Sequence, residues 1–189
     1  MVEYENMNIT YPITIRNYIN TICQHLGLTF KNVNDTFANY DKEIQNELYL
    51  DSEGGDLGYT FRDVLDELAQ VTASTICINE VDDELEIRYI NDTQDTIDEE
   101  YLKDINVSFG EHYGPINTIV LTRSGGSDSI HYPVVLPENP VEIKIEDNQI
   151  MNFNDRSDYI VDIYNKLNGL QYYIFDFSST GFCYYNLCD

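Results

Sequence analysis

Two short stretches of the chain share a helical pattern of apolar positions. In the first, apolar side chains recur three or four residues apart at Ile15, Tyr18, Ile19 and Ile22. In the second, the same spacing is found at Phe61, Val64, Leu65 and Leu68. Because this spacing places each set on one helix face, the pattern predicts two amphipathic helices.

The two stretches also share the frame Thr-apolar-Arg-Asx-apolar-apolar, which aligns without a gap from Thr14 and from Thr60. Threonine is a favoured helix N-cap, and Gly27 supplies a stop for the first helix. Each predicted helix leads into a β-rich stretch, so we interpret the copies as a duplicated helix–strand unit. Repetition favours a scaffold over a catalyst, because a catalytic site needs different residues in one place.

Alternating apolar and polar residues predict strands in much of the remaining chain. Residues 74–79 and 84–89 flank an acidic turn and predict a β-hairpin. Beyond residue 100, further strands are predicted at 105–109, 116–122, 130–135, 141–145 and 170–177. One helical stretch, residues 157–167, is predicted among them.

The acidic segment 92–100 separates the two helix–strand units from the strand-rich stretch that follows, and it is the predicted linker. The sequence therefore predicts an α+β protein in two parts. Residues 1–92 form a two-helix α/β lobe built from the duplicated unit. Residues 93–189 form a β-rich lobe, resembling an antiparallel barrel or sandwich, with the inserted helix 157–167. Because 182–189 is β-prone and has no polar tail, we expect the chain to be cut from something longer.

Composition narrows the class of protein. The 189 residues are 42% hydrophobic and 13% aromatic, which is typical of a globular fold. No apolar run reaches the roughly 18 residues of a membrane span, and residues 1–6 lack signal-peptide features. We therefore expect no membrane span and no export directed by this sequence itself.

The chain has 34 acidic and 10 basic residues, a net charge of −24. Such a surface repels phosphate groups, so specific nucleic-acid binding is not expected. An acidic wall would instead let DNA pass without retaining it. The alternative interpretation is that the charge only maintains solubility.

The four cysteines show no metal-binding spacing. Cys23 and Cys77 lie in apolar patterns, and we expect both to be free thiols that pack as small hydrophobic residues. Cys183 and Cys188 are expected to be free rather than bridged to each other, in keeping with a reducing place of folding.

Candidate chemistry along the chain is weak. The glycine-rich segment 123–129 has no lysine and opens no helix, so it predicts a hairpin turn and not a phosphate cradle. Ser127, Asp128 and His131 lie near one another in sequence, but no Gly-x-Ser-x-Gly elbow surrounds the serine. They do not predict a catalytic triad.

Metal and sugar sites are no better supported. The three histidines are scattered over separate elements, and the acidic run 92–98 lacks the calcium-loop pattern. Most of the 16 tyrosines, such as Tyr18, Tyr159 and Tyr164, have core spacing and not the layout of a sugar-stacking surface. We predict no catalytic, cofactor-binding or metal-binding residues, and no cofactor. The histidines are His25, His112 and His131, and the aspartates of the run are Asp92, Asp95 and Asp98.

The order of several segments resembles the tail hub or baseplate hub proteins of bacteriophages and prophages, the amino-terminal structural part of tail-associated lysins. The matching segments are 11–15 with the helix that ends at Gly27, 37–39, 59–65 with 68–70, 84–87, and above all 113–121. Two departures stand out. Ala73 replaces a helix-ending glycine, and residues 1–189 match neither the earlier β-domain nor the C-terminal extension that hub proteins usually carry.

The resemblance implies a non-enzymatic, ring-forming subunit, a homotrimer at the distal end of a phage tail. Such a ring contacts the tape-measure protein and the distal tail ring, lines the DNA exit path, and is assembled in the cytoplasm of the bacterial host. Two alternatives remain open: a cell-wall-degrading tail enzyme, either a peptidase or a glycan hydrolase, and a carbohydrate-binding module that contacts a receptor.

Overall fold

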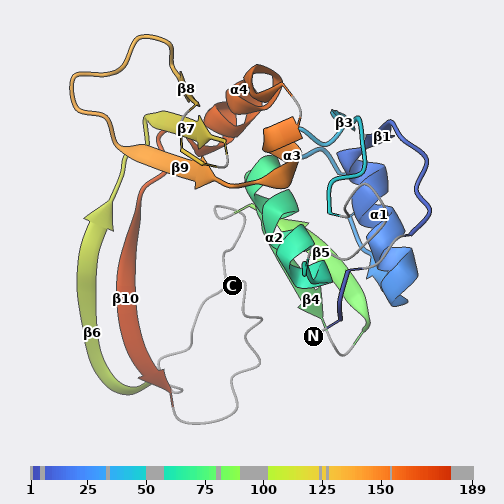
Figure 1. Ribbon diagram of the computed structural model, residues 1–189. Coiled ribbons are helices and arrows are strands. Elements are labelled where there is room, and N and C mark those ends of the chain that lie inside the picture. The colour runs from blue at the N-terminus through green and yellow to red at the C-terminus, as the bar shows by residue number, and fades with distance from the viewer. Residues whose placement is uncertain are drawn as a thin grey trace.

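The chain folds into helices and sheets that are antiparallel or mixed, so it is an α+β protein, as the sequence predicts (Figure 1). The computed structural model describes residues 2–4, 7–32, 35–49, 58–79, 82–89, 102–123, 125–126, 128–153 and 155–179. Among these residues, no helix has both the length and the apolar character needed to cross a membrane.

Both copies of the repeated frame form helices that start in the same way. Helix α1 (Ile15–Leu26) is preceded by Thr14 and helix α2 (Phe61–Thr72) by Thr60, and each threonine oxygen accepts a backbone N–H from the third helical residue. Thr60 also donates its own N–H to Asp63, 2.8 Å away, which completes a capping box. The predicted helices and N-caps are confirmed.

The strands that follow these helices belong to one sheet. Strand β2 (Thr29–Phe30) follows α1, strand β4 (Thr75–Asn79) follows α2, and both pair with β5 (Glu84–Arg88), which lies between them. β4 and β5 form the predicted antiparallel hairpin, whereas β2 is parallel to β5. The repeated unit thus supplies both flanks of this sheet.

The second sheet corrects the expectation of an antiparallel barrel or sandwich. Strand β7 (Thr118–Thr122) lies between β8 (Ser129–Tyr132), which is antiparallel to it, and β9 (Glu142–Glu146), which is parallel to it. The sheet is therefore mixed, and its three strands do not close into a barrel. The long connection from β8 to β9 reverses the chain direction before β9 begins, and side-chain alternation does not encode this.

The predicted helix at 157–167 is confirmed as α4 (Arg156–Leu167), with Asp155 as its N-cap. The sequence analysis missed a short helix before it, α3 (Gln149–Phe153). α4 packs against β7 and β8. α3 packs against α2, so it connects this helix and sheet to the N-terminal half.

Two further strand pairs are antiparallel. β1 (Ile13–Thr14) pairs with β3 (Glu43–Ile44) at the start of α1. β6 (Leu102–Tyr113) pairs with β10 (Tyr172–Ser179) in a long ribbon that extends away from the helices (Figure 1). At the base of the ribbon, Gly114 has φ 106°, and a Cβ there would lie 2.5 Å from the carbonyl oxygen of Leu170. The backbone approach therefore requires glycine.

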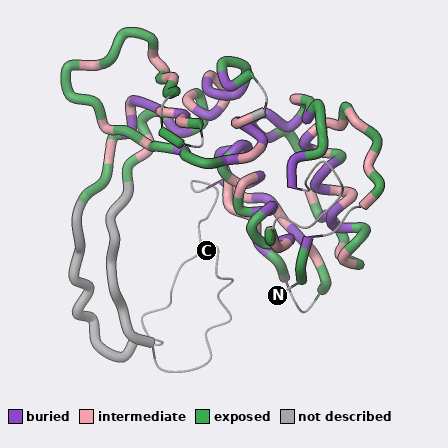
Figure 2. Tube along the Cα trace, viewed as in Figure 1, coloured by how far each residue is buried: buried purple, intermediate pink, exposed green. Residues whose placement is uncertain are grey.

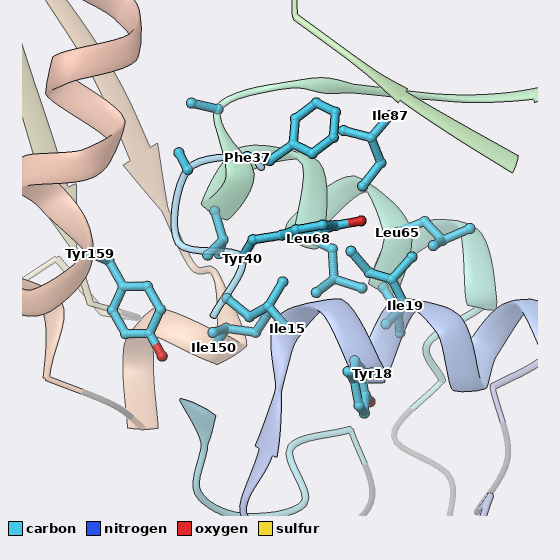
Figure 3. Packing of buried hydrophobic residues seen from close by; sticks show 14 of the residues in the cluster. Ile15, Tyr18, Ile19, Phe37, Tyr40, Leu65, Leu68, Ile87, Ile150 and Tyr159 are labelled. Atoms are coloured by element: carbon cyan, nitrogen blue, oxygen red, sulfur yellow. The ribbon is translucent and has the colours of Figure 1, made fainter. Parts of the chain in front are cut away.

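Buried residues occur in both halves of the chain (Figure 2). Their apolar side chains form one cluster, part of which Figure 3 shows. Ile15 and Leu68 of the first half and Ile150 and Tyr159 of the second all belong to it. The acidic linker 92–100 and the β-prone end 182–189 lie outside the described residues. The division at residue 92 remains a prediction, but the core does not stop there.

The cysteines differ from one another. Cys23 is a free, buried thiol, as expected, and burial raises its pKa to about 12. Cys77 is disulfide-bonded, so the expectation of a free thiol there is wrong. Cys183 and Cys188 lie outside the described residues. Disulfide pairing depends on distances in the folded chain, which the cysteine spacing does not specify.

Candidate functional site

A half-buried carboxyl group lies where α2 meets α3. Oε2 of Glu67 accepts a hydrogen bond from the Tyr49 hydroxyl at 3.0 Å and one from the backbone N–H of Gln149 at 2.8 Å. Burial raises the pKa of Glu67 to about 7, although these two hydrogen bonds act in the opposite direction. Among the described carboxyl groups, this pKa shift makes Glu67 the clearest candidate for a functional group.

The neighbours of Glu67 hold the same joint together. Asn148 Nδ2 donates to the backbone oxygen of Glu67 at 2.9 Å and to Oε1 of Gln70 at 3.0 Å. The Gln149 side chain donates to the Tyr59 hydroxyl at 2.9 Å. The residues at the start of α3 are therefore fixed to α2 and to the segment before α2. The hydrogen bonds that do this join residues far apart in sequence.

Aromatic rings pack beside this carboxyl group. The Tyr49 ring contacts those of Tyr4 and Tyr59, each with centroids 5.2 Å apart. The Tyr4 hydroxyl is hydrogen-bonded to that of Tyr18 at 2.7 Å. Burial raises the pKa of Tyr49 well above its usual value, so its hydroxyl stays protonated and remains a donor to Glu67. These tyrosines serve the interior, as their spacing predicts for Tyr18.

The remaining tyrosines from the sequence analysis are placed as follows. Tyr159 is buried, as predicted, and Tyr164 is partly buried against the ring of Tyr132, with centroids 4.9 Å apart. The side chains of residues 172, 173, 184 and 185 lie outside the description.

An acidic hollow of about 420 Å³ opens between the β3 region and the start of α4. It is lined by Asp41, Lys42, Glu43, Gln45, Asp155, Asp158 and Tyr159. Two of its carboxylates already have partners: Asp41 lies 3.3 Å from the Arg16 guanidinium, and Asp155 accepts the Ser157 hydroxyl at 2.7 Å. The hollow repels anions.

The glycine-rich segment connects β7 to β8 and is the hairpin turn that the sequence predicts. Arg156, at the start of α4, is buried and donates to the backbone oxygens of Leu121 at 3.1 Å and Asp128 at 2.6 Å. It also contacts the Asp128 carboxylate at 2.6 Å and holds the pKa of Asp128 below its usual value. Asp128 therefore fastens the hairpin to α4, and Ser127 lies outside the described residues.

The histidines lie on different elements and are exposed: His25 on α1, His112 on β6 and His131 on β8. His25 stacks on Phe61, and His131 lies within hydrogen-bond distance of the Val134 carbonyl oxygen, at 3.3 Å. The described ranges contain no group of three or more His, Cys, Asp or Glu side chains that could hold a metal ion. The run 92–98 is outside those ranges.

Sequence reasoning missed Glu67. The available signal was its position three residues after Val64 and four before Val71, both buried, which places it at the edge of the apolar stripe of α2. Its partners Tyr49 and Gln149 are 18 and 82 residues away, so the sequence gives no indication that they meet.

Comparisons with known proteins find no matching family model, no matching curated protein and no matching solved structure.

Proposed function

We propose that this chain is a structural subunit of a bacteriophage or prophage tail tip, of the baseplate hub type, and not an enzyme. One observation carries the proposal: the half-buried Glu67 and the buried Arg156 are both engaged in holding the fold together. Glu67 receives the hydroxyl of Tyr49, and Arg156 binds Asp128. A hydrolase needs a pocket where acid, base and nucleophile converge. The sequence resemblance to tail hub proteins suggests the class of scaffold.

An exposed apolar loop supports self-association. Between β8 and β9, Val134 is 79% exposed, Val135 83% and Leu136 47%. Figure 2 colours most of this connection as exposed. Residues 133–137 carry no charge, in a chain whose net charge is −24. Contiguous exposed apolar residues mark protein contact sites, and copies of an acidic chain repel one another least at an uncharged surface. We assign this loop to the subunit contact of a homotrimeric ring.

The other partners follow from the same proposal. The ring contacts the distal tail ring and the tape-measure protein in the virion tail tip, after assembly in the cytoplasm of the host. Its acidic surface lines the DNA exit path, where like charge prevents retention of the polyanion.

Light scattering after size exclusion tests the ring on the full chain. We expect a mass three times the 21.9 kDa of one chain. Val135→Asp should give a monomer with unchanged circular dichroism, because it places a charge in the contact. Val2→Asp, at a position 60% exposed outside the loop, should remain trimeric. A stable monomer of the unaltered chain at high concentration would count against the proposal.

Two assays address the other protein classes. Release of fragments from purified peptidoglycan that is lost in His131→Ala would replace the scaffold with a hydrolase. Binding to a defined glycan on an array, with no self-association, would instead indicate a receptor-contact module.

A further inference from the structure

Two hydrogen bonds where α2 meets α3 converge on one carboxyl oxygen. Oε2 of Glu67 accepts from the Tyr49 hydroxyl, which precedes α2, and from the backbone N–H of Gln149, which begins α3. Asn148 and the Gln149 side chain, which are uncharged, donate further hydrogen bonds across this joint. Glu67 therefore supplies the carboxyl group among these hydrogen-bonded partners, and Tyr49 and Tyr59 supply phenol groups.

The charges near Glu67 do not favour its ionised form. Asp63, one turn earlier on α2, raises the pKa of Glu67, and none of the described groups that shift this pKa is a cation. The titratable groups on the segment before α2 are Tyr49 and, through Gln149, Tyr59. α3 itself has no titratable side chain, and Asp147 in the turn before it is exposed.

We propose that the Glu67 carboxyl group is a proton-operated latch that holds α3 on α2 when protonated and weakens this contact when ionised. In the protonated form, one oxygen still accepts both hydrogen bonds and no charge is buried. In the ionised form, a negative charge lies half-buried without a cation, which is unfavourable. Separation of α3 from α2 would hydrate this charge, so rising pH favours the open joint.

The direction follows from linkage. Burial raises the pKa of Glu67 from its ordinary value of 4.5 to about 7 in the folded chain. The stabilising contribution of the protonated form is complete below pH 4.5 and is lost as the pH rises through about 7. The latch is thus closed in mild acid and loosened in mild alkali.

Hydrogen exchange measured by mass spectrometry on the full chain tests the latch. After correction for intrinsic rates, we expect the protection of α3 amides to fall about tenfold between pH 6 and pH 8. Glu67→Gln should retain protection at both pH values, because glutamine has the shape and neutrality of the protonated acid. Asp66→Asn removes a charge from the same helix at a side chain 69% exposed, and should behave like the unaltered chain.

Carboxyl ¹³C NMR provides a second measurement. Glu67 should titrate near pH 7. Tyr49→Phe removes a donor to the carboxylate, so it should move this midpoint upward, and the pH at which α3 protection is lost should move upward with it. The proposal is overturned if Glu67 titrates below pH 5, if α3 protection does not change with pH, or if it falls equally in Glu67→Gln. If Glu67→Gln does not fold, Tyr49→Phe decides. The latch is supported if the NMR midpoint and the pH at which α3 protection is lost both move upward, and it is overturned if they do not.

Discussion

Two buried tyrosines place their hydroxyl groups in different surroundings. The Tyr18 hydroxyl is hydrogen-bonded to that of Tyr4 at 2.7 Å. The Tyr40 hydroxyl has no hydrogen-bond partner among the described residues, although the Tyr40 side chain is only 1% exposed. Figure 3 shows it among aliphatic side chains. Tyr40 contributes through its ring, which lies 4.4 Å beneath the Arg16 guanidinium, so its hydroxyl group is an unfavourable addition to the core.

We expect Tyr40→Phe to raise the free energy of unfolding by about 1 kcal/mol, because it removes a buried polar group that makes no hydrogen bond. The matched substitution Tyr18→Phe should lower it by about 1 kcal/mol, since it breaks a hydrogen bond and leaves Tyr4 with one partner fewer. Urea unfolding followed by circular dichroism measures both. A loss of stability in Tyr40→Phe equal to that in Tyr18→Phe would contradict the expectation.

At the scale of elements, α1 and α2 end in the same left-handed turn formed by different residues. Gly27 has φ 73° and Ala73 has φ 51°, and each cap donates its backbone N–H to carbonyl oxygens of the last helical turn. The alanine that departs from the hub pattern therefore adopts the conformation of the expected glycine. A left-handed conformation costs alanine about 1–2 kcal/mol, so the second copy of the unit keeps this turn at a cost in backbone strain.

We expect Gly27→Ala to lower the free energy of unfolding by about 1 kcal/mol, because a Cβ there meets nothing within 4 Å and only strain is added. Ala73→Gly should change it by less than about 1 kcal/mol. Relief of strain is offset by the loss of a methyl group that is 6% exposed and by greater freedom of the unfolded chain. Thermal unfolding measures both variants. A Gly27→Ala variant as stable as the unaltered chain would contradict the left-handed turn at residue 27.

At the scale of the whole molecule, the two halves share one interior. Asn39 Nδ2 donates to the backbone oxygens of Val71 at 2.8 Å and Tyr159 at 3.2 Å, so one amide joins the end of α2 to α4. The Tyr159 hydroxyl donates to the backbone oxygen of Glu43 at 3.1 Å. This shared interior opposes the repulsion among the charges, which amount to −24.

Because salt screens that repulsion, we expect the melting temperature to rise between 10 mM and 300 mM NaCl. A gain of about 1 kcal/mol corresponds to about 2–4 °C for a chain of this length. Scanning calorimetry at constant pH measures the shift. A melting temperature that falls or stays constant with salt would show that self-repulsion is not a significant term.

Much of the local structure could be predicted from the sequence. The frames at Thr14 and Thr60 predict both helix starts, and the alternation in 74–79 and 84–89 predicts the β4–β5 hairpin. α4 was also predicted, to within one residue of its start. These features depend on hydrogen bonds and side-chain spacing within a few residues, so a local pattern is sufficient to specify them.

Other features were decided only by tertiary structure. β9 pairs in parallel with β7, Cys77 is disulfide-bonded, and α3 forms where it meets α2. The candidate site is of the same kind, since burial in the folded chain raises the pKa of Glu67, and the fold brings Gln149, 82 residues away, to its carboxyl group. Burial and long-range pairing depend on which segments meet in space. A single sequence specifies the hydrophobic periodicity of each segment, but it does not specify which other segments that segment packs against.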